Sequence, residues 1–170
     1  MAAPPLVRRL ANAQYRLYDL MRSRSAFGVA RQPPSARDFA GFRGVRQCLV
    51  VTFRRSGEPM PSPVNFGLGD DHTLYLRTDP HTGKVKRIRN NPRVLVVPSG
   101  MFGKPRGPAV EGRARILAAD EIEAAERAIK ANFSRPMAVL EAGLEAGAER
   151  FGVGMTYVEI TPQEDRTSRD

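Results

Sequence analysis

The segment from Thr82 to Pro92, with the sequence TGKVKRIRNNP, carries residue types that proteins use to bind phosphate. It follows an alternating stretch that ends at Thr78, so we expect the chain to pass from a strand into a short helix. Asp79 or Thr82 can cap this helix. The first turn of a helix offers backbone N–H groups without intrahelical acceptors, and here a hydroxyl and the Lys84 ammonium stand beside them. The segment therefore predicts a phosphate site at a helix start.

The same helix is expected to have two distinct faces. Lys84 and Arg87 are three residues apart and share one face, while Val85 and Ile88 share the adjoining apolar face, which can anchor the helix. A basic helix that is only solvated fits these residues equally well. The residue types alone do not decide between a phosphate site and a solvated helix.

Positive charge is concentrated in the middle of the chain. The 170 residues carry a formal net charge of +9, and the isoelectric point is near 10.5. Between residues 77 and 115 there are ten basic and two acidic side chains, which account for +8 of that total. We therefore expect an anionic partner to meet this stretch. Nucleic acid is the weaker possibility, because Phe102 is the only aromatic residue there and bases would find few side chains to stack on.

Side chains for acid–base or nucleophilic catalysis are scarce in this sequence. Its two histidines, His72 and His81, both fall in expected turns and have neither the cysteine partners nor the helical spacing that would favour a zinc site. They are also poorly suited to act as the base that activates a serine or cysteine nucleophile. If the protein is an enzyme, we therefore expect its reactive group to come from a cofactor.

Cys48 and Glu111 both fall in expected strands. Cys48 lies in an apolar run, where a small buried side chain is favoured over a reactive thiol. Glu111 is either a buried acid or an ion-pair partner of Arg93, Arg113 or Arg115. A single cysteine permits no intramolecular disulfide, which favours a cytoplasmic location. The sequence contains no run of about eighteen apolar residues, so it predicts no membrane span.

The expected elements are mostly short strands. Six stretches show strand patterns bounded by turn residues, at 47–53, 60–68, 73–78, 93–98, 109–117 and 154–161. Helices are expected at 6–21, after Thr82, from Asp120 and at 136–150. The first three strands have short connections and should form an antiparallel meander. Because strands and helices do not alternate, the pattern predicts a mainly β (α+β) fold, a small antiparallel barrel with peripheral helices.

Three segments in combination give a more specific signal. They are the turn and strand from Gly57 to Asn65, the strand and helix over 74–92, and the strand VEGRAR over 110–115. In this order they resemble the pyridoxamine 5'-phosphate oxidase-like split-barrel superfamily, and more narrowly its flavin/deazaflavin branch of oxidoreductases that use coenzyme F420. The resemblance covers residues 39 to 117 well and the closing strand near Tyr157 weakly.

The resemblance implies a split β-barrel with a cofactor held in a groove between the two barrels of a homodimer. Matched position by position, the implied phosphate-binding residues are Ser62, Thr82, Gly83, Lys84 and Lys86. Val64 and Asn65 would border the cofactor's ring system, and Arg87 could reach its anionic tail.

Two positions depart from the pyridoxamine oxidase pattern. Ser62 replaces an arginine that is usual on the second strand, and Gly83 replaces an arginine beside the phosphate lysine. Both changes weaken the case for FMN and for a pyridoxamine phosphate substrate. Both are compatible with F420, whose long anionic tail also suits the local excess of positive charge. FMN stays the alternative cofactor.

The resulting hypothesis is an F420-dependent oxidoreductase that transfers a hydride between the deazaflavin and a small organic substrate. A non-catalytic protein that binds or carries FMN, F420 or heme is the alternative, and a nucleic-acid-binding barrel is a third, weaker one. The expected division is an N-terminal helix and connector over 1–40, a split-barrel cofactor-binding domain over 41–162 and a polar tail over 163–170. We expect no nucleic-acid partner and no membrane partner.

Overall fold

The structure is a computed structural model, which describes residues 23–69, 73–134 and 154–163 of the chain. The helices expected at 6–21 and 136–150, the turn at His72 and the polar tail from residue 164 lie outside the described residues. Among the described residues, no helix is long and apolar enough to cross a membrane.

One antiparallel sheet contains the strands of the described residues. They are β1 (Gln47–Phe53), β2 (Pro59–Asn65), β3 (Gly67–Leu68), β4 (Leu74–Thr78), β5 (Arg93–Ser99), β6 (Val110–Ile116) and β7 (Thr156–Pro162). Their hydrogen-bonded order is β2-β1-β5-β6-β7-β4-β3. Five of the six strands predicted from the sequence are present to within one or two residues at each end. The sixth, predicted at 60–68, is broken in two at Phe66.

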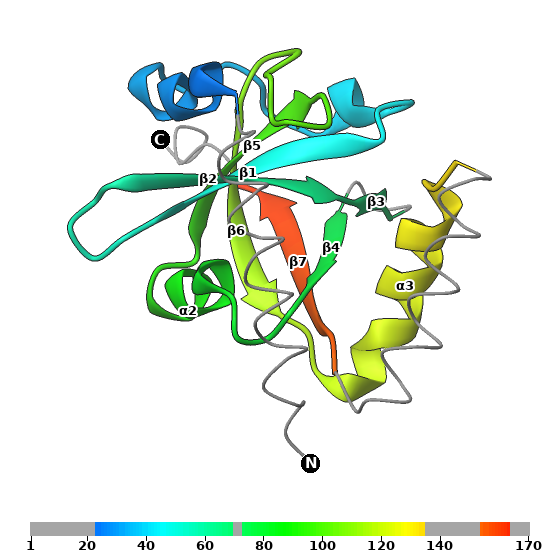
Figure 1. Ribbon diagram of the computed structural model, residues 1–170. Coiled ribbons are helices and arrows are strands. Elements are labelled where there is room, and N and C mark those ends of the chain that lie inside the picture. Colours follow the sequence, from blue (N-terminus) through cyan, green and yellow to red (C-terminus); the bar gives the residue numbers. More distant parts are fainter. Residues whose placement is uncertain (1–22, 70–72, 135–153, 164–170) are drawn as a thin grey trace, which may run out of the picture.

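The break at Phe66 lets the two halves of the predicted strand pair with different neighbours. β2 pairs with β1, where Ser62 lies opposite Val50, whereas β3 pairs with β4, where Gly67 lies opposite Tyr75. β2 and β3 therefore follow one another in the chain but stand at opposite ends of the strand order. The sheet has to curl for this to be possible, and Figure 1 shows it curled, with helices at its periphery. The predicted mainly β, antiparallel barrel with peripheral helices is confirmed.

Alternation along β1 divides its side chains between two apolar cores. Cys48 and Val50 belong to the inner core of the curled sheet. Leu49 and Val51 face the other side, where Ala26 packs against them. Ala26 is part of η1 (Arg24–Arg31), a 3-10 helix in the connector.

The connector also contributes aromatic side chains to the inner core. Phe39 precedes η2 (Ala40–Phe42), a single 3-10 turn, and its ring centroid lies 5.2 Å from that of Phe42 in an edge-to-face arrangement. The ring centroid of Phe42 in turn lies 5.7 Å from that of Phe66. These three rings join the connector to the point where the second strand breaks.

Two α-helices of the described residues pack on the sheet (Figure 1). α2 (Gly83–Asn90) buries Val85 and Ile88, the two residues predicted to anchor it, and contacts β1 and β6. α3 (Ile122–Ala131) follows the 3-10 turn η3 (Ala119–Glu121) and packs on β3 and β4. α2 therefore follows β4 in the chain and packs against β1, which is distant from it in the sequence.

α3 crosses β3 so closely that only glycine fits beneath it. A Cβ atom at Gly67 would overlap the helix backbone at Ala128. Just beyond the helix, Asn132 Nδ2 donates hydrogen bonds to the carbonyl oxygens of Val45 at 3.0 Å and Phe66 at 2.9 Å. The end of α3 is thus fixed to the start of β1 and to the break between β2 and β3.

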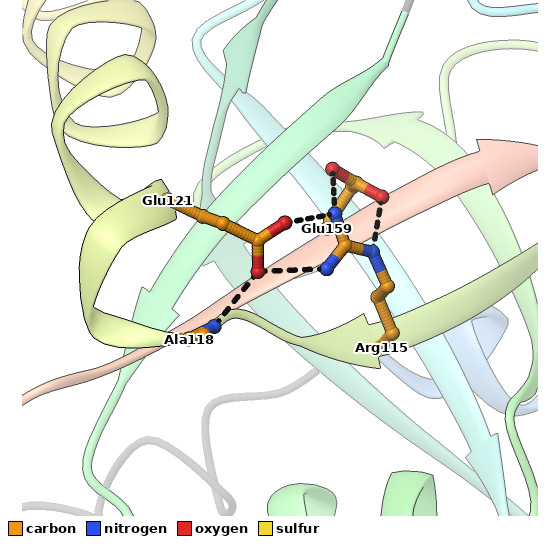
Figure 2. A network of polar contacts seen from close by, with 4 residues as sticks. All are labelled: Arg115, Ala118, Glu121 and Glu159. Atoms are coloured by element: carbon orange, nitrogen blue, oxygen red, sulfur yellow. Dashed lines mark hydrogen bonds and ion pairs between the residues drawn. The ribbon is translucent and has the colours of Figure 1, made fainter.

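Arg115 of β6 joins η3 to β7 through two bidentate ion pairs (Figure 2). Its nitrogens lie 2.7 and 2.9 Å from the carboxylate oxygens of Glu121, and 2.6 and 2.9 Å from those of Glu159. Glu121 Oε2 also accepts the backbone N–H of Ala118 at 2.9 Å. The network therefore holds the segment that leads into α3 against the sheet.

This network should make stability depend on pH. Hydrogen bonds from Arg115 and from the Ala118 backbone lower the pKa of Glu121 from 4.5 to about 2. Because its pKa is lower in the folded protein, the contribution of Glu121 is complete above about pH 4.5 and is lost as the pH falls toward 2. Replacing Arg115 with methionine should lower the urea midpoint at pH 7, and the gap to the unchanged protein should narrow as the pH falls from 4.5 to 2. A gap that is constant with pH would contradict this.

Candidate functional site

The start of α2 brings four of the predicted site residues together: Thr82, Gly83, Lys84 and Arg87. Thr82 is the N-cap residue, but its side chain makes no capping hydrogen bond. Its Oγ1 instead donates to the carbonyl oxygen of Asp79 at 2.9 Å. The Lys84 ammonium donates to Thr78 Oγ1 at 3.2 Å, and Lys84 is half-buried. Thr82 thus leaves the first-turn N–H groups uncapped, next to a positioned cation.

Arg87 is held by β1. Its Nε donates a hydrogen bond to Thr52 Oγ1 at 2.7 Å. Thr52 is fully buried, and its hydroxyl donates in turn to the carbonyl oxygen of Met60. This second hydrogen bond is long, at 3.3 Å. The guanidinium lies over the first turn of α2, because a Cβ atom at Gly83 would be 2.8 Å from its terminal nitrogen. Sequence reasoning missed Thr52, for which the only signal was a hydroxyl within an apolar strand.

The three predicted residues on β2 are divided between its two faces. Ser62 and Val64 lie opposite residues of β1 that face the inner core, and Val64 is buried there. Asn65 faces the other side, where its Oδ1 accepts a hydrogen bond from Gln47 Nε2 at 3.1 Å. The side chains of Val64 and Asn65 therefore point to opposite faces of the sheet. Among the described residues, no hydrogen bond joins these three side chains to α2.

The Lys84 ammonium lies within electrostatic range of the inner core. Burial raises the pKa of the Cys48 thiol, and the charge of Lys84 opposes that rise. Cys48 is fully buried, which confirms the prediction of a small core side chain rather than a reactive thiol. Val64 lies opposite Cys48 in the β1–β2 pair.

A basic hollow of about 540 Å³ lies between α2 and the turn that joins β1 to β2. Its lining residues are Phe53, Arg54, Arg55, Gly83, Lys86, Arg87, Asn90 and Asn91. Three predicted site residues, Gly83, Lys86 and Arg87, therefore border one cavity. Arg54 and Arg55 were not predicted, because they follow a strand that meets α2 only in the folded chain.

Glu111 is engaged by an arginine. Its carboxylate accepts two hydrogen bonds from Arg93, at 2.8 and 3.1 Å, and this pairing raises the pKa of Arg93. The Arg93 guanidinium also lies 4.7 Å from the centroid of the Phe53 ring. Of the two roles that the sequence left open for Glu111, the structure shows the ion pair, and its partner is Arg93.

Comparisons with known proteins agree with this architecture. The family model described as pyridoxamine 5'-phosphate oxidase matches residues 34–163. No curated protein matches the sequence. Among solved structures, a conserved hypothetical protein from Mycobacterium tuberculosis is 17% identical with a TM-score of 0.55, over 78% of this chain and 87% of that one.

Two further solved structures share the fold. A protein of unknown function from Agrobacterium tumefaciens is 18% identical with a TM-score of 0.55, over 78% of this chain but only 58% of that one. A candidate 5-nitroimidazole antibiotic resistance protein from Bacteroides thetaiotaomicron is 19% identical with a TM-score of 0.51, over 71% of this chain and 75% of that one. At these identities the likeness shows the fold alone.

The family match spans 130 of the 170 residues and includes every residue predicted for the site. It begins in the connector that supplies Phe39 to the inner core and extends one residue past β7. It therefore covers the whole curled sheet. On the strength of this match, the chain belongs to the pyridoxamine 5'-phosphate oxidase family.

Proposed function

We propose that the protein is an oxidoreductase that binds coenzyme F420, with FMN as the alternative, and transfers a hydride between the cofactor and a small organic substrate. The observation that carries the proposal is the start of α2, where an N-cap threonine that does not cap lies beside a lysine held by Thr78. Family membership supports a flavin-type cofactor. When bound, that cofactor would supply the redox chemistry.

The helix start suits a phosphate group. Backbone N–H groups of the first turn provide neutral donors, and the Lys84 ammonium adds one compact positive charge. Thr82 Oγ1 donates to a backbone carbonyl in this structure and could rotate to meet a phosphate oxygen instead. In the proposal, Thr82, Gly83 and Lys84 hold the phosphate, and Ser62 of β2 contributes to the same phosphate site.

The other predicted residues take different parts in the proposal. Val64 and Asn65 would border the ring system with their backbone, because the Val64 side chain is buried in the inner core and the Asn65 side chain is on the other face. Lys86, predicted beside the phosphate, lines the basic hollow together with Arg87. Both would therefore meet the anionic tail.

F420 should bind more tightly than FMN. Ser62 and Gly83 provide no arginine for a flavin phosphate, whereas the tail of F420 adds anionic groups that Lys86 and Arg87 can meet. We expect F420 to bind at least about tenfold more tightly, a difference of roughly 1.4 kcal/mol. Absorbance titrations of the purified protein with each cofactor measure both constants. Isolation of the protein with stoichiometric FMN would contradict this ranking.

A carrier that binds the same cofactor without turnover is the second candidate. The pairing of Glu111 with Arg93 favours it, because that carboxylate is engaged and would not serve as a proton donor or acceptor. Candidate substrates added to the protein loaded with reduced cofactor separate the two functions. Oxidation of the cofactor that depends on substrate supports the enzyme, and its absence with every substrate class supports the carrier.

The proposal includes the homodimer that the resemblance implies. In that arrangement a second barrel completes the groove that holds the cofactor. Light scattering should then give about twice the 18.8 kDa mass of the chain. A monomer at micromolar concentration would count against a shared groove.

A further inference from the structure

The aromatic cavity, a space of about 650 Å³, lies between three parts of the chain that are far apart in the sequence. They are η1, the turn that joins β1 to β2, and the corner between α2 and β5. Its volume is in the range of sites that bind small molecules. The lining residues are Phe27, Ala30, Arg31, Phe53, Gly57, Glu58, Pro59, Asn91 and Arg93.

The aromatic cavity is separate from the residues proposed to hold the cofactor. η1 packs on the core that contains Leu49, whereas α2 contributes Ile88 to the inner core. The two helices therefore lie on opposite faces of the sheet (Figure 1). The cavity shares Phe53 and Asn91 with the basic hollow, but the two spaces have no cation in common. Lys84 lines neither of them.

Three side chains of the aromatic cavity retain hydrogen-bond donors that the fold does not use. Within residues 23–69, 73–134 and 154–163, the exposed Arg31 side chain has no hydrogen-bond or ion-pair partner. Arg93 donates to Glu111 through Nε and Nη2, so its Nη1 can still donate. Asn91 Oδ1 accepts the backbone N–H of Arg93 at 3.1 Å, and the Asn91 amide nitrogen can likewise still donate. A ligand in the cavity would therefore be recognised through its acceptors.

The charge balance of the aromatic cavity favours an anion. Glu58 is the acidic residue of the lining, and its carboxylate lies 3.1 Å from Arg54. Arg93 is paired with Glu111 at 2.8 Å. Each of these pairs is neutral as a whole, so Arg31 carries the positive charge that remains in the lining. A carboxylate would supply the missing counter-charge and could accept a hydrogen bond from Arg93 Nη1.

The apolar part of the cavity suits a flat ring. Phe53 supports the Arg93 guanidinium, which lies 4.7 Å from its ring centroid. The Phe27 side chain is 43% exposed, and Ala30 and Pro59 are small side chains beside the two rings. Aromatic ligands gain from contact with phenylalanine rings and with the planar face of an arginine. The ligand that matches both parts of the lining is an aromatic carboxylate.

Backbone hydrogen bonds hold two walls of the cavity in place. In the turn, Gly57 has a φ of +85° and donates its N–H to the Arg54 carbonyl at 2.9 Å. The Arg54 N–H donates to the Glu58 carbonyl at 2.9 Å. At the start of η1, the Ser23 N–H donates to the Phe102 carbonyl at 2.8 Å. The cavity is thus formed before any ligand binds, which lowers the entropic cost of binding.

We propose that the aromatic cavity binds a small aromatic carboxylate, at a site separate from the cofactor. The ring would pack against Phe27 and Phe53, and the carboxylate would lie between Arg31 and Arg93. None of these four residues takes part in the proposed cofactor site, so the cavity can bind its ligand whether or not F420 is the cofactor.

Cinnamate, a flat ring with one carboxylate, is the probe, titrated into the full chain by calorimetry at low salt. It should bind saturably and at least about fivefold more tightly than cinnamamide, which has the same ring and no charge. This comparison uses the unchanged protein, so it does not depend on how any variant folds. Absence of saturable binding, or equal affinities for the two compounds, overturns the site.

Variants place the probe within the molecule. Arg31→Gln should weaken cinnamate about fivefold, and Phe27→Leu about threefold. Arg24→Gln is the matched control, because it removes the same charge from an exposed residue of η1 that does not line the cavity. Arg24→Gln and Lys84→Ala should each change the affinity by less than about twofold. The site is overturned by unchanged affinity in Arg31→Gln or Phe27→Leu, or by a loss in Arg24→Gln or Lys84→Ala equal to that in Arg31→Gln.

Discussion

Replacing Lys84 with alanine should weaken binding of the phosphate-bearing cofactor by about ten- to a hundredfold. The Lys84 ammonium is positioned by Thr78 beside the start of α2, where one charge-assisted hydrogen bond to phosphate is expected. Such a bond is worth about 1.5–3 kcal/mol, which corresponds to that range of dissociation constants. Titration of cofactor absorbance, with F420 first and FMN second, measures the loss.

Two further variants decide whether the effect is specific. Lys84→Met keeps most of the half-buried aliphatic stem and should lose as much affinity as alanine, while unfolding at nearly the same urea concentration. Arg89→Ala removes the same charge from an exposed position that neither lines the basic hollow nor shares the Lys84 face. Its affinity should change by less than about twofold. A loss at Arg89 equal to that at Lys84 would mean that only diffuse positive charge matters.

Gly67→Ala should destabilise the fold by about 3 kcal/mol. The added methyl group would overlap the backbone of α3 at Ala128, and the helix cannot move away freely, because Asn132 fixes its end to Val45 and Phe66. Relief of the overlap therefore has to distort either the β3–β4 pair or the packing of α3 on it. Urea unfolding followed by circular dichroism should show a lower midpoint with a similar slope.

Gly41→Ala is the matched control for this substitution. Gly41 lies in η2, a Cβ atom added there would meet nothing within 4 Å, and its backbone is not left-handed. Its replacement should change the free energy of unfolding by less than about 1 kcal/mol. Equal midpoints for the two variants would show that α3 does not press on β3 as closely as described.

Local patterns in the sequence were sufficient to predict most of the elements. Alternating residues and turn residues act over a few positions, so β1 was predicted at its observed bounds and α2 with its anchors Val85 and Ile88. The predicted strand over 60–68 was wrong in one respect, because its pattern runs without a visible interruption. Its break at Phe66 follows from closure of the curled sheet and from the contact of α3 with Gly67.

The candidate site also has a part that local sequence predicts and a part that depends on the fold. Thr82, Gly83, Lys84 and Arg87 are neighbours in the sequence, so the helix start could be predicted without knowledge of the fold. The cofactor titrations test the phosphate proposal for these four residues. The superfamily followed from the order of three short segments in the chain, and the family match bears it out.

What only the tertiary structure decided is which distant side chains surround α2. Thr52 lies 35 residues before Arg87 in the chain, yet the two share a hydrogen bond of 2.7 Å. Arg54 and Arg55 follow Thr52 along the same strand and turn, and reach the basic hollow for the same reason. β1 is placed beside α2 by its pairing with β2 and β5, and that pairing depends on the strand order of the whole sheet. Strand order is set by closure and by burial on both faces of β1, and no short stretch of sequence contains that information.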